Sequence, residues 1–422
     1  MNFKKWFTFS FILLLSLVIL VACGGGGEDD TTAGDDTDSS ESTESAENGD
    51  SDASGDTLKI GVVTTLSGPY GEIGKEMVDG IEIAVDEVNE QDGILGKQIE
   101  LVIEDDEGEP DVAIRKAEKM ALDDGIELFF GSVASGVTLA LSEKMIEWDT
   151  MLITTTPKSM ELTESDSNKN FFRINHNDNQ DVLAIEHWMN NADLPYDDFY
   201  FVGADYEWGH DLLSEMTTIV EGIGGEILGE EYTPLGNTDF STVLTNARSK
   251  NPDVILAAYA GGDGVNFLSQ VDSFGIVDED IDIIIVPMGD SLATTNPELT
   301  SGVYGPVNYH YSQDFENNVS FVEKFEATHD YMPTNFSGES YAGVEMLIQA
   351  IEEANSSDPL EVIQTLESDF TFESAMGELS VHPETHQVLH PNYIGEFYEN
   401  SETGEADIQI VHSIDTEDVN PE

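Results

Sequence analysis

From residue 57 onward, the pattern of apolar and polar positions alternates between strand-like and helix-like stretches. Leu58, Ile60 and Val62 recur at every second position and predict a strand, whereas Met77, Ile81, Ala84, Val85 and Val88 recur at helical spacing. The same unit then repeats. The next predicted strands are 98–103, 126–130 and 151–154, and the next predicted helices are 110–122 and 137–148. Strands that alternate with amphipathic helices indicate a parallel sheet covered on both faces.

A second series of alternating elements follows the first. Its predicted helices are 180–189, 210–221, 240–250 and 265–274, and its predicted strands are 199–204, 226–232, 254–259 and 281–286. Helices are also predicted at 315–331, 341–354 and 360–366, followed by a tail rich in strands from Gly377. The pattern predicts an α/β protein with two halves. In such sheets ligands bind beyond the carboxyl ends of the strands, so the candidate residues are sought there.

The N-terminal residues have the features of a secretory signal. Lys4 and Lys5 precede a short apolar run from Phe7 to Leu20, which predicts a signal peptide at 1–22. The run ends in Val21, Ala22 and Cys23, which resembles the lipobox of bacterial lipoproteins, and Cys23 is the single cysteine. We expect lipidation of Cys23 to anchor the protein to the outer face of the cell membrane. The stretch 24–56 holds 12 acidic and no basic residues, so 23–56 is predicted to be a disordered tether.

The charge of the chain excludes one class of partner. Fifteen Lys and Arg stand against 86 Asp and Glu, giving a net charge of −71. Binding to nucleic acid requires a basic surface, so we expect no nucleic-acid partner. Self-repulsion of this size is tolerable where salt shortens the screening length, which predicts a halophilic source.

Several segments together resemble the solute-binding proteins of branched-chain amino acid ABC importers, of the leucine/isoleucine/valine-binding type. The resemblance covers nearly all of 57–422 and is carried by LKIGVVTTLSGPYGEIGK, FFRINHNDNQD, SYAGVEMLIQAI and MGELSVHPETHQ. It implies two Rossmann-like lobes of the type I periplasmic-binding-protein kind, joined by three crossovers near Asn175, Asn308 and Ala375. The implied lobes are 57–175 with 309–375, and 176–308 with 376–422. The lobes are expected to close over one solute, an amino acid or a related amide or carboxylate.

The resemblance places the ligand carboxylate in the loop after the third strand. Ser135 falls on the family's serine, between Ala134 and Gly136, and this loop opens a helix whose first amides favour an anion. The next loop carries Thr156 and Lys158. Lys158 stands where the family has a threonine, and we expect it to bind a carboxylate, with a surface ion pair as the alternative.

Other candidate ligand residues come from both halves. The family places an aromatic residue that covers the ligand just before a glycine, which here is Trp208 before Gly209, and Tyr206 is nearby and could take its place. Tyr70 and Ile73 are expected at an apolar wall of the ligand site. The family's aromatic falls on Ile73, which indicates a ligand other than leucine. Two residues are candidates for binding a ligand ammonium. Asp263 follows the strand that ends at Tyr259, and Asp290 is the acidic residue nearest to Gly289, on which the family's acidic position falls. Tyr259 is included as a strand-end residue.

No motif for catalysis or for a cofactor is present. The chain lacks GxxxxGK[ST] and GxGxxG, and the segment from Gly338 to Ala342 falls one residue short of GxSxG. His382, His386 and His390 are spaced in fours, but Pro383 and Pro391 oppose one continuous helix, so no metal is expected. We therefore expect a non-enzymatic binding protein without a cofactor, acting with an ABC importer permease. A sensor domain for a signalling receptor, or less plausibly a hydrolase, remains the alternative.

Overall fold

A computed structural model describes residues 57–164, 169–192, 194, 196–277, 281–401 and 403–420. The predicted signal peptide, Cys23 and the acidic tether lie outside these residues. Across the described ranges, every helix is either too short or too polar to cross a membrane.

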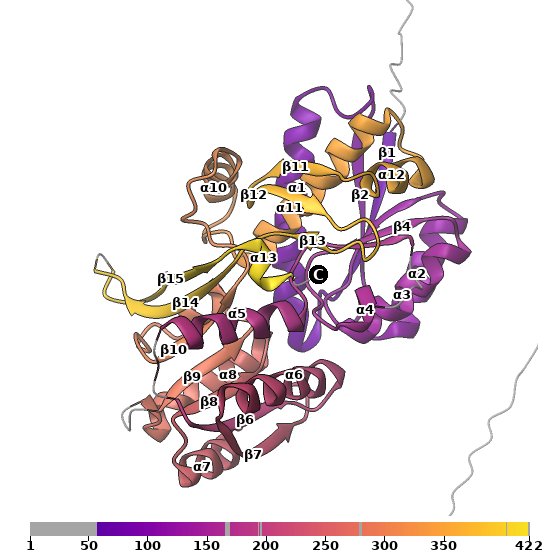
Figure 1. The fold of residues 1–422 in the computed structure, drawn as a ribbon. Helices are drawn as coiled ribbons and strands as arrows, with labels where there is room; N and C mark the ends of the chain where they lie inside the picture. Colours follow the sequence, from indigo (N-terminus) through magenta and orange to yellow (C-terminus); the bar gives the residue numbers. More distant parts are fainter. Residues whose placement is uncertain are drawn as a thin grey trace, which may run out of the picture. The chain divides into compact units, whose positions relative to one another are not determined.

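The sheet of the first lobe has five parallel strands in the order β2-β1-β3-β4-β5 (Figure 1). One face packs on α1 and the later helix α11, and the other packs on α2 and α3. The elements are β1 (Thr57–Thr64), η1 (Gly68–Tyr70), α1 (Gly71–Glu90), β2 (Gln98–Asp105), α2 (Pro110–Leu122), β3 (Leu128–Phe130), α3 (Ser135–Glu147), β4 (Met151–Thr154), α4 (Glu161–Glu164), β5 (Phe171–Arg173) and α11 (Asn335–Ala354).

The sheet of the second lobe has seven strands in the order β15-β14-β10-β9-β8-β6-β7. Strands β10, β9, β8, β6 and β7 are parallel, whereas β14 and β15 join antiparallel at one edge. The elements are α5 (Asp178–Asn191), β6 (Asp198–Ala204), α6 (Glu207–Ile223), β7 (Glu226–Thr233), α7 (Ser241–Lys250), β8 (Val254–Ala258), α8 (Gly261–Val271), η2 (Asp272–Phe274), β9 (Asp282–Val286), α9 (Asp290–Thr294), β10 (Val303–Val307), β14 (Asn392–Glu399), β15 (Ala406–Ile414) and α13 (Thr416–Val419).

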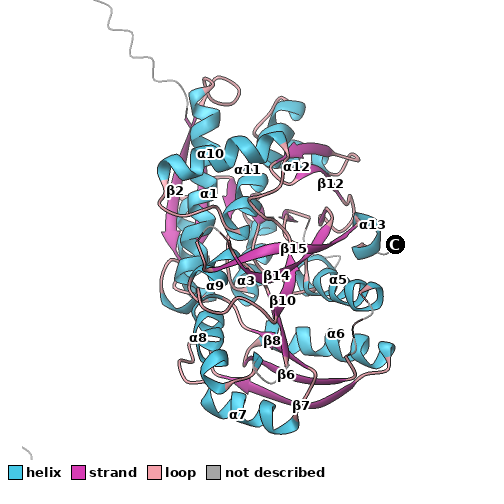
Figure 2. Ribbon diagram, turned by 90° about the vertical axis from the view of Figure 1, so that its left-hand side faces the viewer, coloured by secondary structure: helices cyan, strands magenta, loops and turns pink. Residues whose placement is uncertain are grey.

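Between β10 and β14 the chain returns to the first lobe. Helix α10 (Glu316–Thr328) packs on α1, and α12 (Pro359–Leu366) packs on α11. A small antiparallel sheet follows, formed by β11 (Thr371–Ser374), β12 (Gly377–Val381) and β13 (Val388–Leu389). Figure 2 shows α10, α12 and β12 at the end of the molecule opposite α7 and β7.

The third crossover lies later in the chain than the sequence indicated. We expected the chain to pass to the second lobe near Ala375, but Met376, Leu379 and Val388 are buried in the core of the first lobe. The chain joins the second sheet at Asn392, where β14 begins. The third crossover is therefore moved from Ala375 to the residues just before Asn392, because the apolar side chains of β12 and β13 pack on the first lobe.

The two-lobed α/β architecture is confirmed, and the differences lie mainly at the ends of elements. Helix α11 begins at Asn335 rather than at 341, because Thr334 caps it by accepting a hydrogen bond from the backbone of Ser337. Helix α6 begins at Glu207 rather than at 210. The short strands β5 and β10 were not predicted, since runs of three to five residues give little periodicity.

Candidate functional site

A cavity lies between the two lobes, at the carboxyl ends of their strands. Its free volume is about 30 Å³, room for little more than water, so the lobes as they stand leave little space for a solute. Seven of the residues expected from the sequence line it: Tyr70, Ile73, Ser135, Thr156, Lys158, Tyr206 and Trp208. Five further residues line it: Val133, Pro157, Ala260 and Pro287 lie in the strand-end loops, whereas Phe336, on α11, was not expected.

One wall of the cavity is formed by the start of α3. Ala134 is the N-cap residue and makes no side-chain capping bond, so the first amides of α3 are left for another acceptor. Ser135 follows at the first helical position and is buried, and its Oγ accepts a weak hydrogen bond from the backbone of Ser159 at 3.4 Å. Ala134 packs beside the cavity, while Gly136 is not among the lining residues and faces Glu207. The arrangement suits a carboxylate.

The next loop contributes Thr156, whose hydroxyl is buried. Its Oγ1 has no hydrogen-bond partner among the described residues. A buried hydroxyl without a partner costs folding free energy, so this group is available to a polar atom of a ligand.

Aromatic side chains from both lobes meet at the cavity. The hydroxyl of Tyr70, on the first lobe, donates to the hydroxyl of Tyr206, on the second, at 2.7 Å. The rings of Tyr206 and Trp208 lie 5.8 Å apart between centroids. Gly261 allows the second lobe to lie close to the first, because a Cβ at this position would be only 2.9 Å from the carbonyl oxygen of Pro69. The structure is thus a closed state, with the lobes in contact over the cavity.

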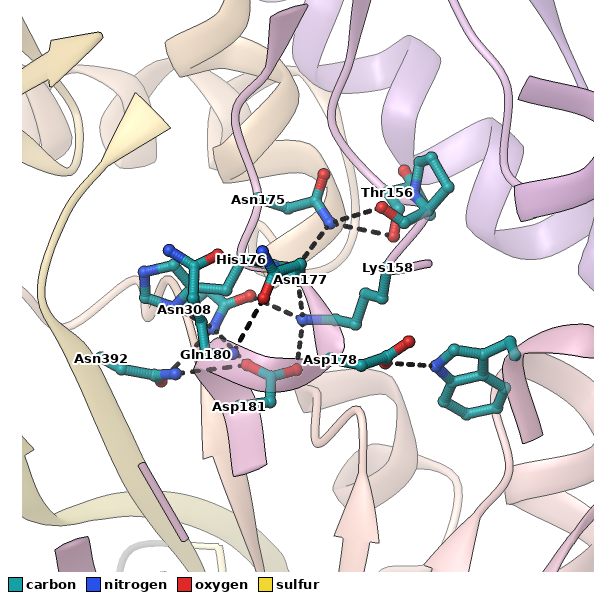
Figure 3. Close-up of polar contacts among 12 residues, drawn as sticks. Thr156, Lys158, Asn175, His176, Asn177, Asp178, Gln180, Asp181, Asn308 and Asn392 are labelled. Carbon is teal, nitrogen blue, oxygen red and sulfur yellow. Dashed lines mark hydrogen bonds and ion pairs between the residues drawn. The ribbon is translucent and has the colours of Figure 1, made fainter. Parts of the chain in front are cut away.

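Lys158 borders the cavity, but its ammonium group is used by the hinge. Figure 3 shows it donating to Asp181 Oδ2 at 2.5 Å, to Asn308 Oδ1 at 2.9 Å and to the backbone oxygen of His176 at 3.3 Å. An ammonium has three donors, so none is left for a ligand. The expectation that Lys158 binds a ligand carboxylate is corrected on this ground.

The same network joins all three crossovers. Asp181 Oδ1 accepts from the amides of Asn308 and Asn392, each at 3.2 Å. His176 lies on the first crossover, Asn308 on the second and Asn392 on the third. The side chains of Lys158 and Asp181 are only 7% and 0% exposed, so this is a buried ion pair within a hinge.

Three candidates from the second lobe lie away from the cavity lining. Tyr259 is fully buried in the core, packs edge-on against Phe240, and its hydroxyl accepts from Thr233. Asp263 accepts from the backbone of Gly236 at 3.0 Å and holds that loop. Asp290 Oδ1 lies 3.4 Å from His310 Nε2. Tyr259 and Asp263 have hydrogen-bond partners within their own lobe, whereas Asp290 Oδ1 has none among the described residues.

Two groups of residues have side chains of the kinds that bind metal ions. The ligand atoms of Asp290, His310 and Asp407 lie within 4.8 Å of one another. Asp407 accepts hydrogen bonds from the hydroxyl of Tyr311, from Asn400 and from its neighbouring backbone, whereas Asp290 Oδ1 and His310 Nε2 have no hydrogen-bond partner among the described residues. His382, His386 and His390 do not converge, because His386 contacts the backbone of Phe171 and His390 contacts that of Ile174.

One residue of chemical interest was missed by the sequence analysis. Asp178 is the first residue of α5, fixed there by the capping box between Asn177 and Gln180. Its Oδ1 accepts from the indole Nε1 of Trp208 at 2.7 Å, and its Oδ2 is buried without a partner among the described residues. Burial raises the pKa of this carboxyl group well above its ordinary value, although the charge of Lys158 opposes the shift. The sequence signal that could have drawn attention to it is the pair of acidic residues, Asp178 and Asp181, on either side of Gln180 next to the first crossover.

Comparisons with known proteins agree with this architecture. The periplasmic binding protein family matches residues 57–402. Leu/Ile/Val-binding protein BraC3 of Rhizobium johnstonii is 27% identical over 319 residues, which is 74% of this chain and 83% of the relative. Leu/Ile/Val-binding protein homolog 2 of Brucella abortus is 26% identical over 330 residues, which is 76% of this chain and 85% of the relative.

Solved structures show the same fold. A solute-binding protein of an ABC transporter from Rhodopseudomonas palustris BisB5, in complex with 3,4-dihydroxybenzoic acid, has a TM-score of 0.79 at 22% identity, covering 85% of this chain and 98% of that chain. An ABC transporter substrate-binding protein from Sphaerobacter thermophilus has a TM-score of 0.77 at 24% identity, with the same coverage. The chain therefore belongs to the periplasmic binding protein family.

Proposed function

We propose that this protein captures a small amino-acid-like solute outside the cell and delivers it to the permease of an ABC importer. The observation that carries the proposal is the cavity between the lobes, which has the start of α3 on one side and the aromatic residues of the second lobe on the other. The names of the relatives from Rhizobium and Brucella, which are Leu/Ile/Val-binding proteins, support an amino acid.

The solute is proposed to bind by its carboxylate to the first lobe. The first amides of α3, the hydroxyl of Ser135 and the unpaired hydroxyl of Thr156 all donate hydrogen bonds to an anion. The apolar wall formed by Ile73, Val133 and Phe336 receives the body of the solute. Because this cavity is small in the closed state, a compact solute fits better than a peptide or a sugar chain.

A calorimetric titration of the full chain tests the proposal. The panel consists of L-leucine, L-phenylalanine, L-glutamine, urea and benzoate. We expect saturable binding of at least one amino acid, and a rise in unfolding temperature that grows with its concentration. If no solute in the panel binds, capture of amino-acid-like solutes is ruled out. Binding of benzoate in preference to every amino acid would move the protein to the aromatic-acid class that neighbouring solved structures bind.

We further propose that lipid on Cys23 anchors the protein and that residues 23–56 tether it to the membrane. The lipobox-like sequence and the acidic stretch support this. Labelling of cells with a radioactive fatty acid should mark the protein, and Cys23→Ser should abolish the label. An unlabelled wild-type protein would contradict the anchor.

The acidic composition is proposed to reflect a salty environment. Screening lengths fall from about 10 Å at 0.1 M to about 3 Å at 1 M salt, which reduces repulsion among the charges that give the net charge of −71. The unfolding temperature should therefore rise across this range. A flat or falling curve would contradict adaptation to salt.

A further inference from the structure

Three side chains outside the cavity bring atoms of the kinds that bind metal ions close together. Asp290 is the first residue of α9, His310 follows the second crossover by two residues from Asn308, and Asp407 is the second residue of β15. None of the three is among the residues that line the cavity. One nitrogen or oxygen atom from each lies within 4.8 Å of those of the other two. The fold thus gathers two carboxylates and one imidazole from three separate segments.

Two of these atoms are buried and make no hydrogen bond. The side chains of His310 and Asp290 are only 3% and 8% exposed. His310 Nε2 and Asp290 Oδ1 have no hydrogen-bond partner among the described residues, although the two atoms lie 3.4 Å apart. Buried polar atoms nearly always have a partner, because burial removes the hydrogen bonds that water would supply. Two such atoms side by side indicate a shared partner.

The distance between these two atoms fits a shared metal ion. A Zn²⁺ ion lies about 2.0–2.2 Å from a histidine nitrogen or a carboxylate oxygen, so two such ligands at a tetrahedral angle are about 3.4 Å apart. His310 Nε2 and Asp290 Oδ1 have this separation. A direct N–H···O hydrogen bond would instead bring the atoms to about 2.7–3.2 Å, with the N–H aimed at the oxygen. The geometry therefore favours two atoms that bind a third body over two atoms that bind each other.

A neighbouring hydroxyl group holds the imidazole in the orientation that a metal ligand needs. His310 Nδ1 lies 2.7 Å from Ser312 Oγ, and when Nδ1–H donates to this oxygen, Nε2 keeps its lone pair for a metal. The longer contact from the backbone N–H of Ser312 to Nδ1, at 3.3 Å, is lost in that tautomer. The imidazole ring also stacks on Tyr311, with the ring centroids 4.4 Å apart. The free edge of His310 is thus fixed towards Asp290.

The two carboxylates have no Lys or Arg partner. The Lys residues that form ion pairs across the described ranges all pair with other acids. Asp407 accepts from neutral groups, which are the hydroxyl of Tyr311, the amide of Asn400 and the adjacent backbone, and carboxylates that bind metals are commonly held by such bonds. Asp407 is only half-buried, so an ion reaches the site from its side. A divalent cation would neutralise both carboxylates, whereas a protonated His310 would neutralise one.

We propose that Asp290, His310 and Asp407 form a binding site for a divalent transition-metal ion such as Zn²⁺ or Mn²⁺. Imidazole suits zinc and carboxylate suits manganese, while the nitrogen ligand disfavours Ca²⁺, which prefers oxygen. The site joins α9, the segment after the second crossover and β15, so a bound ion stabilises the second lobe beside the hinge. This inference does not depend on which solute the cavity binds.

A calorimetric titration of the full chain tests the site, after EDTA treatment and dialysis to remove both metal and chelator. The probes are ZnCl₂, MnCl₂ and CaCl₂ in 1 M NaCl, which screens weak binding of cations to the 86 acidic residues. We expect one tight site per chain for Zn²⁺ or Mn²⁺, at least about tenfold weaker binding of Ca²⁺, and a rise in unfolding temperature with the preferred ion. His310→Gln and Asp290→Asn should each weaken binding about 100-fold, and Ser312→Ala, which keeps all three ligands, about tenfold.

His386→Gln serves as the matched control. His386 is also buried, and its Nε2 lies 3.2 Å from Glu367 Oε1, but both of its ring nitrogens have hydrogen-bond partners. This variant should keep the wild-type affinity for the metal. A measurement without variants is anomalous scattering from a wild-type crystal grown with ZnCl₂, which should give a peak about 2.0–2.1 Å from His310 Nε2.

Several results would overturn the inference. If neither Zn²⁺ nor Mn²⁺ binds the wild type tightly, His310 and Asp290 form a simple ion pair and no metal site exists. Equal affinity in His310→Gln and wild type, or an equal loss in His386→Gln, would place the ion elsewhere, as would an anomalous peak away from His310. Ca²⁺ binding as tightly as Zn²⁺ and Mn²⁺ would contradict a transition-metal site.

Discussion

Replacing Lys158 by methionine is expected to destabilise the folded protein by about 3–5 kcal/mol, the usual cost of breaking a buried ion pair. Methionine fills much of the same space, so the loss is electrostatic. The variant would leave Asp181, which is 0% exposed, with only the amides of Asn308 and Asn392 as partners. A buried carboxylate without a counterion is poorly solvated.

The effect should be large compared with that of a surface pair. Lys144 and Glu147 lie 2.8 Å apart with 36% and 64% of their side chains exposed, and Lys144→Met should cost no more than about 1 kcal/mol. The double variant Lys158→Met with Asp181→Asn should recover most of the loss, because the buried charge is then removed. Urea unfolding followed by tryptophan fluorescence measures all three variants.

Two results would refute the role given to Lys158. If Lys158→Met unfolds within about 1 kcal/mol of wild type, the pair is not a buried hinge contact. If the double variant is no more stable than the single one, the loss does not arise from an unpaired Asp181. Either result would reopen the assignment of Lys158 to the ligand.

Three further predictions concern the closed state and the cavity. Tyr70→Phe removes the hydroxyl bond between the lobes and should weaken solute binding several-fold through faster release, whereas unchanged release rates in stopped-flow fluorescence would argue against this contact. Ser135→Ala should weaken carboxylate-bearing solutes by up to about tenfold with little change in unfolding temperature, and equal affinity would remove the hydroxyl from the site. Burial raises the pKa of Glu76 from 4.5 to about 8, so the folded state holds a proton that the unfolded chain releases above pH 4.5. Its contribution to stability should fall by up to about 1.4 kcal/mol per pH unit as pH rises from 4.5 to 8. Urea unfolding should show a shallower fall of the free energy of unfolding with pH in Glu76→Gln than in the wild type, and an equal slope would contradict this role of Glu76.

The fold could be predicted from the sequence because its signal is local. Strand and helix periodicities repeat along the chain, and the strand-end loops that contain Tyr70, Ser135, Thr156 and Trp208 do border one cavity. Ends of elements depend on caps, so the start of α11 at Asn335 required the contact between Thr334 and Ser337. Periodicity alone cannot supply that information.

The roles of the charged residues could not be predicted, because they depend on partners far away in the sequence. Lys158 meets Asp181 and Asn308, which lie 23 and 150 positions further along the chain, and no local pattern encodes this. Asp178 gains its importance from Trp208 on another helix. In the same way, the alternating pattern of β12 and β13 fits either lobe, and only their packing places them in the first.

The most direct test of solute capture is a crystal structure of the full chain grown with the amino acid that binds most tightly. We predict one solute between the lobes, with its carboxylate at Ser135 and the first amides of α3. A solute bound outside this cavity would contradict capture between the lobes. So would an empty cavity in crystals grown at a solute concentration that saturates binding.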